Sequence, residues 1–290
     1  MKRVALLVNP TSGKGRGARA GTEAAARLRE HGAQVDVIVG ETGADASELA
    51  ARAVDRGYDA LVAVGGDGMV HLVLQAVAGT GTPLGIVPAG SGNDFARLIG
   101  LEAHAYAAAA DVVAAGKVRT VDAGQVGERW FAGVLSSGFD SNVNERANRM
   151  RWPRGAMRYN VAIVAELRVF HAVPFRIRLD GELIEREAML VAVGNGTSYG
   201  GGMQVAPSAL VDDGLLSVTV LGKLGKLEFL RVFPTVYKGT HVDHPAVSVH
   251  TARTVELDAP GVVAYADGEY VRPLPCAATC VAGALQVLAP

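Results

Sequence analysis

The residues that say most about chemistry are Gly65, Gly66, Asp67 and Gly68, which follow directly after an apolar run at residues 59–64. Such a run is typical of a strand buried on both faces, so these residues form the turn at its carboxyl end. Glycine lets backbone N–H groups approach a phosphate closely, and a nearby carboxylate can hold a cation. The pattern predicts a site for a nucleotide phosphate.

Two further glycine-rich loops follow predicted strands and have a similar composition. One covers residues 9–17 and begins with Asn9, and the other covers residues 88–94 and contains Ser91, Asn93 and Asp94. Each loop alone also fits an ordinary structural turn. Because the carboxyl ends of parallel strands meet at one edge of a sheet, the three loops together predict a single crevice.

Two common nucleotide-binding motifs do not fit the sequence. A P-loop needs Ser or Thr after its lysine, but Lys14 is followed by Gly15. Residues 15–20 match the pattern G-x-G-x-x-A of dinucleotide-binding proteins. However, only Asp36 is a loose candidate for the acidic residue expected about twenty positions later. These observations argue against an NAD-dependent oxidoreductase.

The elements that must position the three loops alternate between strand and helix over residues 1–117. The predicted strands are residues 4–8, 34–39, 60–64 and 84–88, and the predicted helices are residues 18–29, 45–56, 70–78 and 103–115. This alternation predicts an α/β domain in which helices cover a mostly parallel sheet.

Residues 118–290 have a different pattern, in which short runs of Val, Leu and aromatic residues alternate with Gly, Pro and Asp turns. Asp180 and Gly181 form a hairpin-type turn between two such runs. Helical patterns at residues 154–170 and 224–237 interrupt the runs. We expect an antiparallel β-sandwich-like domain with helical inserts, separated from the first domain by a cleft. Its last strands are free to return toward the first domain.

The composition limits the class of protein. A net charge of −1 over 290 residues argues against a nucleic-acid-binding protein. The two cysteines, Cys276 and Cys280, have no metal-binding cluster nearby in the sequence, which predicts free thiols in a reducing cytoplasm. No apolar run approaches the ~18 residues that span a bilayer, and the apolar start is too short for a secretion signal. We expect a cytoplasmic protein without a transmembrane segment.

Seven short motifs occur in order along the chain. They are Asn-Pro-x-Ser-Gly at 9–13, Gly-Gly-Asp-Gly at 65–68, Pro-x-Gly-Ser-x-Asn-Asp-Phe-Ala at 88–96, Ser-Gly-Phe-Asp at 137–140, Gly-Asn at 194–195 with Tyr-Gly-Gly at 199–201, Asp-Asp-Gly-Leu at 212–215 and Asp-Gly-Glu at 267–269. This series resembles the diacylglycerol kinase catalytic family, which includes bacterial lipid kinases and sphingosine or ceramide kinases. Gly-Gly-Asp-Gly alone would also fit NAD kinases and phosphofructokinases, so the order of the motifs carries the resemblance.

The resemblance implies that ATP and Mg²⁺ bind at the edge of the first sheet. The implied nucleotide-binding residues are Asn9, Thr42, Gly65, Gly66, Asp67, Gly68, Met69, Val70, His71, Ser91, Asn93 and Asp94. Asp67 would act through Mg²⁺, because its carboxylate would repel a phosphate. The residues alone leave a second interpretation open, in which Asp67 caps the helix that follows.

Glu269 is the expected catalytic base. Phosphoryl transfer to a hydroxyl needs a carboxylate within hydrogen-bond reach of the attacking O–H, and the resemblance implies this role for Glu269. Taken alone, Asp-Gly-Glu also fits a hairpin turn with an exposed glutamate. As a base, Glu269 would require the second domain to fold back, so that its carboxylate faces residues 65–68 across the cleft.

The resemblance also implies a second, structural Mg²⁺ site away from the ATP phosphates. Its ligands would be the carboxylate of Asp213 and the main-chain carbonyls of Leu210 and Leu215. An ordinary Asp-Asp-Gly turn is the alternative. Separately, five arginines lie near Trp152 and Met157 and suit either anionic lipid headgroups or a solvated helix face: Arg146, Arg149, Arg151, Arg154 and Arg158.

Met69 departs from the pattern of the resembled family, which usually has Thr or Ser after Gly-Gly-Asp-Gly. Methionine cannot donate a hydroxyl hydrogen bond to a phosphate, and the loss of one such bond predicts roughly ten- to hundredfold weaker nucleotide binding. We expect the backbone N–H of Met69 to remain available to the nucleotide.

Taken together, these features predict a membrane-peripheral kinase that transfers phosphate from ATP to a lipid hydroxyl. Diacylglycerol is the default acceptor, and a sphingoid base or another hydroxylated lipid is an option. An acyl chain would pack against residues that fit a hydrophobic core equally well: Phe229, Leu230, Phe233, Val236 and Tyr237. Two alternatives stay open, a catalytically weak nucleotide- or lipid-binding homologue and a kinase of a soluble acceptor such as NAD. A homodimer is also left open.

Overall fold

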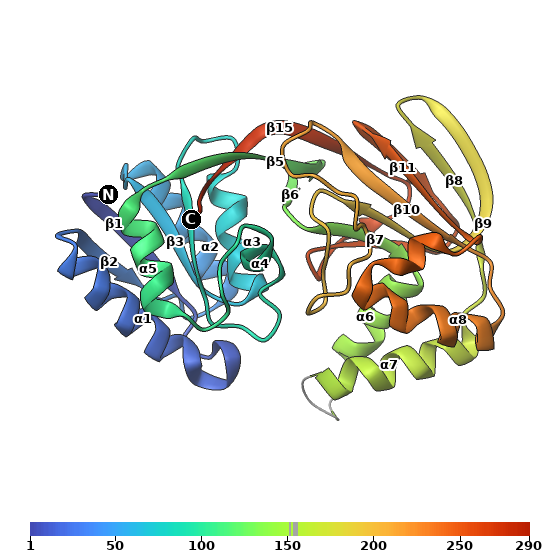
Figure 1. Ribbon diagram of the computed structural model, residues 1–290, viewed down its shortest axis with the longest axis horizontal. Helices are drawn as coiled ribbons and strands as arrows, with labels where there is room; N and C mark the ends of the chain where they lie inside the picture. The colour runs from blue at the N-terminus through green and yellow to red at the C-terminus, as the bar shows by residue number, and fades with distance from the viewer. Residues whose placement is uncertain (151, 153–155) are drawn as a thin grey trace.

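The computed structural model describes residues 1–150, 152 and 156–290. Arg151 and Arg154 of the arginine cluster lie outside the described residues, as does the side chain of Arg158. The chain forms two domains whose strands belong to one continuous sheet of 15 strands, and two long strands run between the domains (Figure 1). In the described residues, no helix is both long enough and apolar enough to cross a membrane.

The N-terminal domain is an α/β domain with a parallel sheet. Its strands pair in the order β2-β1-β3-β4. The elements are β1 (Arg3–Val8), α1 (Ser12–Glu30), β2 (Gln34–Ile38), α2 (Gly43–Asp55), β3 (Ala60–Gly65), α3 (Asp67–Val77), β4 (Leu84–Pro88), α4 (Asp94–Leu98) and α5 (Tyr106–Ala115). All four predicted strands are present. The short helix α4 was not predicted, and the predicted helix at residues 103–115 begins at Tyr106.

Alternation along the strands explains how the helices cover this sheet. Val4 and Leu6 of β1 pack with alanines of α1 and with α5, whereas Ala5 and Leu7 pack with α2 and α3. Strand β3 is buried along its whole length, as its apolar run predicted. The carboxyl ends of all four strands therefore point toward one edge, where the glycine-rich loops begin.

The C-terminal domain is an antiparallel, β-sandwich-like domain with helices packed below it (Figure 1). Its elements are β5 (Val118–Val126), β6 (Arg129–Phe131), β7 (Val134–Gly138), α6 (Phe139–Arg149), α7 (Ala156–Val169), β8 (Val173–Leu179), β9 (Glu182–Gly194), β10 (Leu216–Gly222), α8 (Lys226–Val232), η1 (Phe233–Lys238), η2 (Thr240–Asp243), β11 (Val247–Ala252), β12 (Thr254–Asp258), β13 (Val263–Ala266), β14 (Glu269–Pro273) and β15 (Cys276–Leu288). Asp180 and Gly181 form the predicted hairpin turn between β8 and β9, and both have positive φ.

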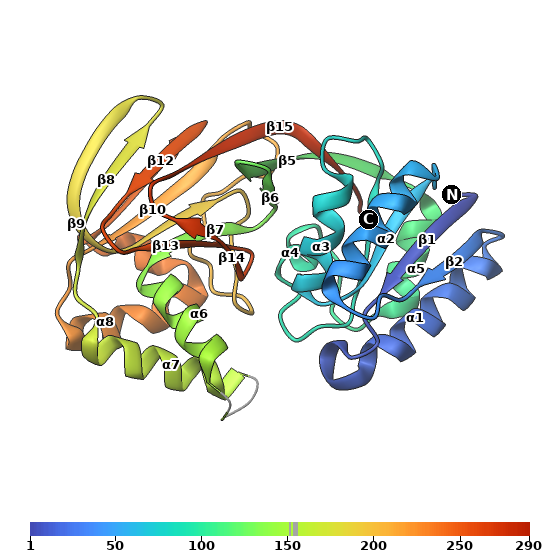
Figure 2. The same ribbon diagram turned by 180° about the vertical axis from the view of Figure 1, so that it is seen from behind.

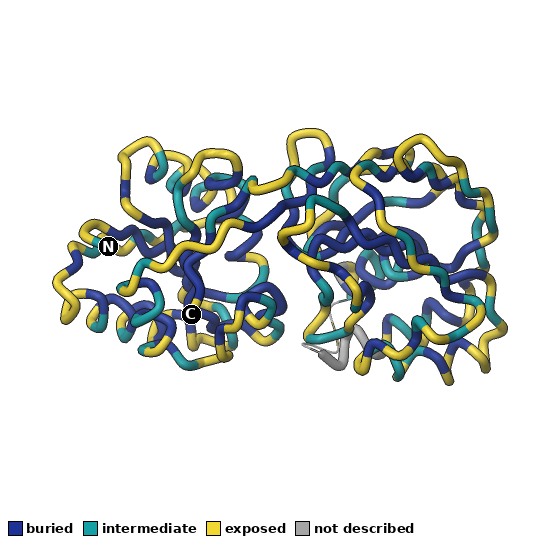
Figure 3. The backbone as a smooth tube through the Cα atoms, turned by 45° about the horizontal axis from the view of Figure 1, so that its top comes forward, coloured by how far each residue is buried: buried dark blue, intermediate teal, exposed yellow. Residues whose placement is uncertain are grey.

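Strands β5 and β15 connect the two domains. They pair with each other in antiparallel fashion, and Val287 near the end of β15 pairs with Leu84 of β4. Figure 2 shows both strands crossing from one domain to the other. The chain thus returns to the N-terminal sheet at its end, and the buried strands form the centre of each domain (Figure 3).

Candidate functional site

The three glycine-rich loops pack against one another at the carboxyl edge of the N-terminal sheet. A Cβ atom added to Gly90 would lie 2.3 Å from the Cα of Gly66, and one added to Gly13 would lie 2.0 Å from the carbonyl oxygen of Ala89. Gly13 also has a φ of +59°. Only glycine allows such close approach of two backbones. The three loops therefore meet at one edge of the sheet, as expected from the sequence.

Asp67 links the second loop to the third. Its carboxylate accepts hydrogen bonds from the backbone N–H groups of Asn93 (2.8 Å) and Asp94 (2.7 Å) at the start of α4. Gly66, not Asp67, is the N-cap of α3, so the cap interpretation fails for that helix. Burial raises the pKa of the Asp67 carboxyl, and the neighbouring charge of Asp94 raises it further.

Asp94 in turn connects the two domains. Its carboxylate accepts hydrogen bonds from the backbone N–H groups of Gly201 (2.8 Å) and Gly202 (2.7 Å) in the C-terminal domain. Arg97 Nη2 also donates to it, at 2.6 Å. The side chain of Asp94 is largely buried. The third loop is therefore fastened to a loop of the opposite domain by charge-assisted hydrogen bonds.

Asp267 makes the reverse connection, from the C-terminal domain to α3. Its carboxylate accepts three backbone N–H groups, those of Ala132 (3.0 Å), Gly133 (2.9 Å) and Val134 (3.1 Å). Nδ1 of His71 in α3 lies 3.4 Å from its Oδ2. The sequence analysis gave Asp267 no role of its own. The available signal was an aspartate directly before Gly268, since Asp tolerates the left-handed backbone seen here, with φ of 51°.

Glu269 faces the turn of residues 65–68 from the C-terminal domain. It is the first residue of β14 and is exposed. Its Oε1 lies 3.9 Å from the position that a Cβ on Gly68 would take. The second domain thus folds back over the turn in the way that a role for Glu269 as base requires.

A cavity of about 660 Å³ lies between the two domains. Its polar end includes Asp67, Ser91, Asp94, Asp267 and Gly268, close to the loops just described. Its other end is lined by apolar side chains of the C-terminal domain, namely Phe139, Val143, Ile163, Leu190, Leu221, Phe229, Val232, Phe233, Val236 and Tyr237. Leu230, which was grouped with these residues in the sequence, is half exposed and does not line the cavity.

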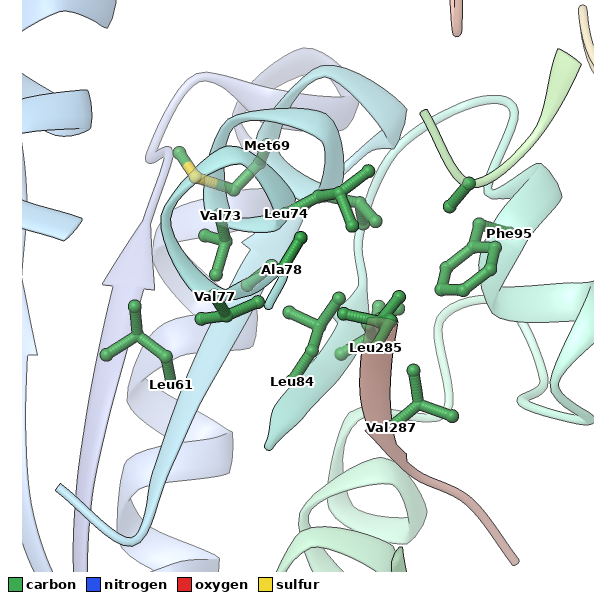
Figure 4. Packing of buried hydrophobic residues seen from close by; sticks show 14 of the residues in the cluster. Leu61, Met69, Val73, Leu74, Val77, Ala78, Leu84, Phe95, Leu285 and Val287 are labelled. Carbon is green, nitrogen blue, oxygen red and sulfur yellow. The ribbon is translucent and has the colours of Figure 1, made fainter. Parts of the chain in front are cut away.

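The backbone of the turn differs from expectation at Met69. Its N–H donates to the carbonyl oxygen of Gly66 at 2.9 Å, so the expectation that this group is free for the nucleotide is wrong. In the described chain, the N–H groups of Gly66 and Gly68 donate to no protein acceptor. The Met69 side chain is only 8% exposed and packs into the cluster between α3 and the sheet (Figure 4).

Other residues assigned to the nucleotide also have structural partners. Asn9 Oδ1 accepts from the N–H and hydroxyl of Thr11. Thr42 is the N-cap of α2, where its hydroxyl oxygen accepts from Asp45 N at 3.1 Å. The side-chain amide of Asn93 binds the backbone of Gly90 in the same loop: its Oδ1 accepts from the Gly90 N–H, and its Nδ2 donates to the Gly90 carbonyl oxygen. Of the assigned residues, Asp67, Val70, His71, Ser91 and Asp94 line the cavity.

The turn assigned to a structural Mg²⁺ lies before β10. Asp213 is exposed, and its Oδ1 accepts from Leu215 N at 3.0 Å. The buried Asp122, which the sequence analysis did not single out, accepts from the N–H groups of Gly214 (2.7 Å) and Gly283 (2.8 Å) and so holds the turn against β15. In the described part of the chain, no three His, Cys, Asp or Glu side chains form a metal-binding group.

Glycine-rich turns at the edge of an α/β sheet face a carboxylate from a β-sandwich-like domain across a shared cavity, an arrangement that a two-domain kinase would need. Two family models match the chain: the diacylglycerol kinase catalytic domain over residues 3–126 and the YegS C-terminal NAD kinase beta sandwich-like domain over residues 133–289. The chain belongs to the diacylglycerol kinase catalytic family, as its motifs predicted.

Relatives match along nearly the whole chain. A diacylglycerol kinase of Mycobacterium tuberculosis is 47% identical, over 99% of this chain and 95% of its own length. One of Staphylococcus saprophyticus is 30% identical, over 94% and 91%. The fold is similar to a crystal structure of a putative diacylglycerol kinase from Bacillus anthracis (TM-score 0.84, 24% identity, covering 100% of this chain and 95% of that one). It is also similar to an NAD kinase from Archaeoglobus fulgidus in complex with ATP (TM-score 0.56, 14% identity, covering 99% and 93%).

Proposed function

We propose that this protein transfers the γ-phosphoryl group of ATP to the hydroxyl of a lipid, with diacylglycerol as the default acceptor. The observation that carries the proposal is the two-ended cavity, polar at the glycine-rich loops and apolar in the C-terminal domain. A pocket of that kind suits a molecule with a polar head and an acyl chain. The names of the relatives agree with this acceptor.

The ATP phosphates would bind at the turn of residues 65–68. The free N–H groups of Gly66 and Gly68 lie at the N-terminus of α3, where the helix dipole favours an anion. Ser91 in the third loop is exposed and lines the same cavity. These donors are preorganised by contacts between the loops, so little reordering is needed when phosphate binds.

Asp67 and Asp94 are the residues that fit Mg²⁺. Two carboxylates share one buried site, and the raised pKa of Asp67 reflects the cost of that arrangement, which a cation would relieve. Mg²⁺ commonly takes one or two protein carboxylates and completes its shell with phosphates and water. When bound, it would neutralise charge on the transferring phosphoryl group. The Asp213 turn, with the carbonyls of Leu210 and Leu215, stays a second, structural candidate.

Glu269 is the proposed base. Its carboxylate is exposed beside Gly68, close to where a terminal phosphate on the turn would lie. A lipid hydroxyl approaching from the cavity could give its proton to Glu269 as its oxygen attacks phosphorus in line with the leaving oxygen. Asp267 would position this residue, because its four hydrogen-bond partners fix the hairpin that carries Glu269.

Access for the lipid would be near η1. Tyr237 lines the cavity yet is 51% exposed, so this wall reaches the surface. Leu227 and Leu230 on the adjacent α8 are also exposed. Exposed apolar residues at the entrance of an apolar pocket suit contact with a membrane surface, and we propose that the protein works there as a peripheral cytoplasmic enzyme.

The test is transfer of labelled γ-phosphate to diacylglycerol in mixed micelles. Glu269→Gln should lower kcat by about a hundredfold or more, the usual share of a general base, with the KM for ATP nearly unchanged. Glu182→Gln is the matched control, an exposed hairpin glutamate without an ion pair among the described residues. Equal activity of wild type and Glu269→Gln would remove the assigned base.

The same assay separates the two alternatives. A catalytically weak binding homologue would leave wild type as silent as Glu269→Gln while ATP still raised the thermal midpoint. A kinase of a soluble acceptor would phosphorylate NAD at a rate that detergent does not change. The apolar wall of the cavity argues against this second alternative, because NAD offers no acyl chain to fill it.

A further inference from the structure

Four aromatic side chains line the apolar end of the cavity in a continuous series. The ring centroids of Tyr237 and Phe233 lie 6.5 Å apart, and those of Phe233 and Phe229 lie 5.8 Å apart. Phe139 completes the series, with its ring centroid 4.8 Å from that of Phe229. Exposure falls from 51% at Tyr237 to 4% at both Phe229 and Phe139. The series therefore runs from the surface into the interior of the C-terminal domain.

The exposed end of this series lies on the side of the glycine-rich loops. The carbonyl oxygen of Val236, which precedes Tyr237 in η1, accepts from the N–H of Gln204 at 3.0 Å. Gln204 lies two residues after Gly202, whose N–H donates to Asp94 of the third loop. A lipid whose reacting hydroxyl lies at the polar end would therefore start its acyl chain near Tyr237 and extend it along the aromatic series.

The buried end of the series lies about one short strand away from the polar end. The N–H of Val134, the first residue of β7, donates to Asp267 at the polar end. Gly138 ends β7 four residues later, directly before Phe139, and four residues of strand span about 13 Å. Leu190 pairs with Gly138 and also lines the cavity. The cavity thus has a limited depth, which ends at the level of Phe139.

Behind Phe139 and Phe229, the cavity stops against a filled core. Both residues belong to one buried cluster with Phe170, whose ring centroid lies 5.4 Å from that of Phe139. In the part of the chain that the structure describes, the cavity reaches neither Phe170 nor Met189 of this cluster. Helices α6, α7 and α8, which supply most of the cluster, lie together below the sandwich (Figures 1 and 2). Phe139 and Phe229 are therefore the boundary between open cavity and packed side chains.

We infer that Phe229, packed against Phe139, sets the length of the acyl chain that the cavity accepts. The inference rests on the proposed function, because it assigns the apolar end to the acceptor's chain. Each methylene that passes from water into this end should raise affinity about fourfold. A methylene beyond the two rings would meet core side chains at native packing density, where there is no room for it. Diacylglycerol remains the acceptor, and the selection acts on the length of its chain.

The test uses 1-acyl-2-acetylglycerols, which keep the single hydroxyl of diacylglycerol while one saturated chain is lengthened stepwise from hexanoyl to hexadecanoyl. Binding of the radiolabelled lipids is measured without ATP, below the concentration at which they aggregate, and phosphoryl transfer is measured in parallel. Wild-type affinity should rise about fourfold per methylene up to a limiting length and no further. Phe229→Leu should move that limit to a longer chain and Phe229→Trp to a shorter one. A general loss of packing would not produce shifts in opposite directions.

Phe175→Leu is the matched control, the same substitution at a buried phenylalanine of the sandwich core that does not line the cavity, and it should keep the wild-type limit. The inference is overturned if wild-type affinity rises through the whole series, or if no lipid binds. It is also overturned if the limit stays unchanged in both Phe229 variants or moves in the same direction in both. If Phe229→Leu does not fold, Phe229→Trp decides alone. A limit that moves as expected without any phosphoryl transfer would uphold the chain selection and reject the proposed kinase activity.

Discussion

At Met69, packing rather than a missing hydroxyl decides what a substitution does. The side chain contacts the cluster formed by α2, α3 and β3, and its Cβ lies 2.8 Å from the position of a Cβ on Gly65. Met69→Thr should lower the free energy of unfolding by about 1–3 kcal/mol, through lost apolar burial and a buried hydroxyl. It should leave the KM for ATP within about twofold of wild type.

Urea unfolding and ATP titration of the transfer rate measure these two effects. Met69→Leu keeps the volume and should cost less than about 1.5 kcal/mol. A KM for ATP that falls tenfold in Met69→Thr would instead show that a hydroxyl here reaches the phosphate, as the sequence comparison with the family suggested.

At the scale of elements, the hydrogen bonds from the start of α4 to Asp67 in α3 depend on Gly92. A Cβ atom at this position would lie 2.3 Å from Oδ2 of Asp67, the oxygen that accepts the Asn93 N–H. Gly92→Ala should therefore push Asp67 away from the start of α4, destabilise the protein by about 1–3 kcal/mol and weaken ATP binding.

The thermal midpoint with and without Mg²⁺·ATP measures both consequences. Gly43→Ala is the matched control, because a Cβ there meets nothing within 4 Å and the residue lies in the first turn of α2. That variant should be neutral or slightly stabilised. If ATP raises the thermal midpoint of Gly92→Ala as much as that of wild type, the hydrogen bonds between Asp67 and the start of α4 do not support nucleotide binding.

The elements that the sequence predicted well are those with a strong local pattern. The apolar run before Gly65 favours a buried parallel strand, and β3 is buried along its whole length. The hairpin at Asp180 and Gly181 is equally local. By contrast, β15 contains four alanines and its apolar residues do not alternate regularly in the sequence, so no local pattern predicts a strand of 13 residues there.

The site was predictable in its residue types but not in its contacts. Asp67 was expected to hold a metal, yet the sequence does not reveal that α4 exists or that its N–H groups reach Asp67. The role of Asp267 depends on partners brought in by long-range pairing, such as Ala132, which lies 135 residues from Asp267 in the sequence. Such partners follow from closure of the whole fold and leave no local signal.

At the scale of the whole molecule, the two domains are joined by two kinds of connection. Strands β5 and β15 form a continuous covalent and hydrogen-bonded bridge on one side. On the side of the cavity, Asp94 binds backbone N–H groups of the C-terminal domain. Asp267 of the C-terminal domain contacts His71 of the N-terminal domain. Paired strands on one side and polar contacts on the other suit a hinge motion. The cleft would open about β5 and β15 when the polar contacts break.

Asp94→Ala should remove one of the polar contacts between the domains without unfolding either domain. The variant lacks the carboxylate that accepts the N–H groups of Gly201 and Gly202. The amide hydrogens of these two glycines should therefore exchange faster with solvent, while those of β3 keep their protection. Phosphoryl transfer should fall more than about tenfold, because the loop of residues 201–202 and the turn of residues 65–68 are no longer held in one geometry and one proposed Mg²⁺ ligand is lost. ATP affinity should fall less, since the N–H groups of Gly66 and Gly68 stay in place.

Asp55→Asn, at an exposed aspartate of α2, serves as the control. Unchanged exchange at Gly201 and Gly202 would show that β5 and β15 alone set the relative position of the domains.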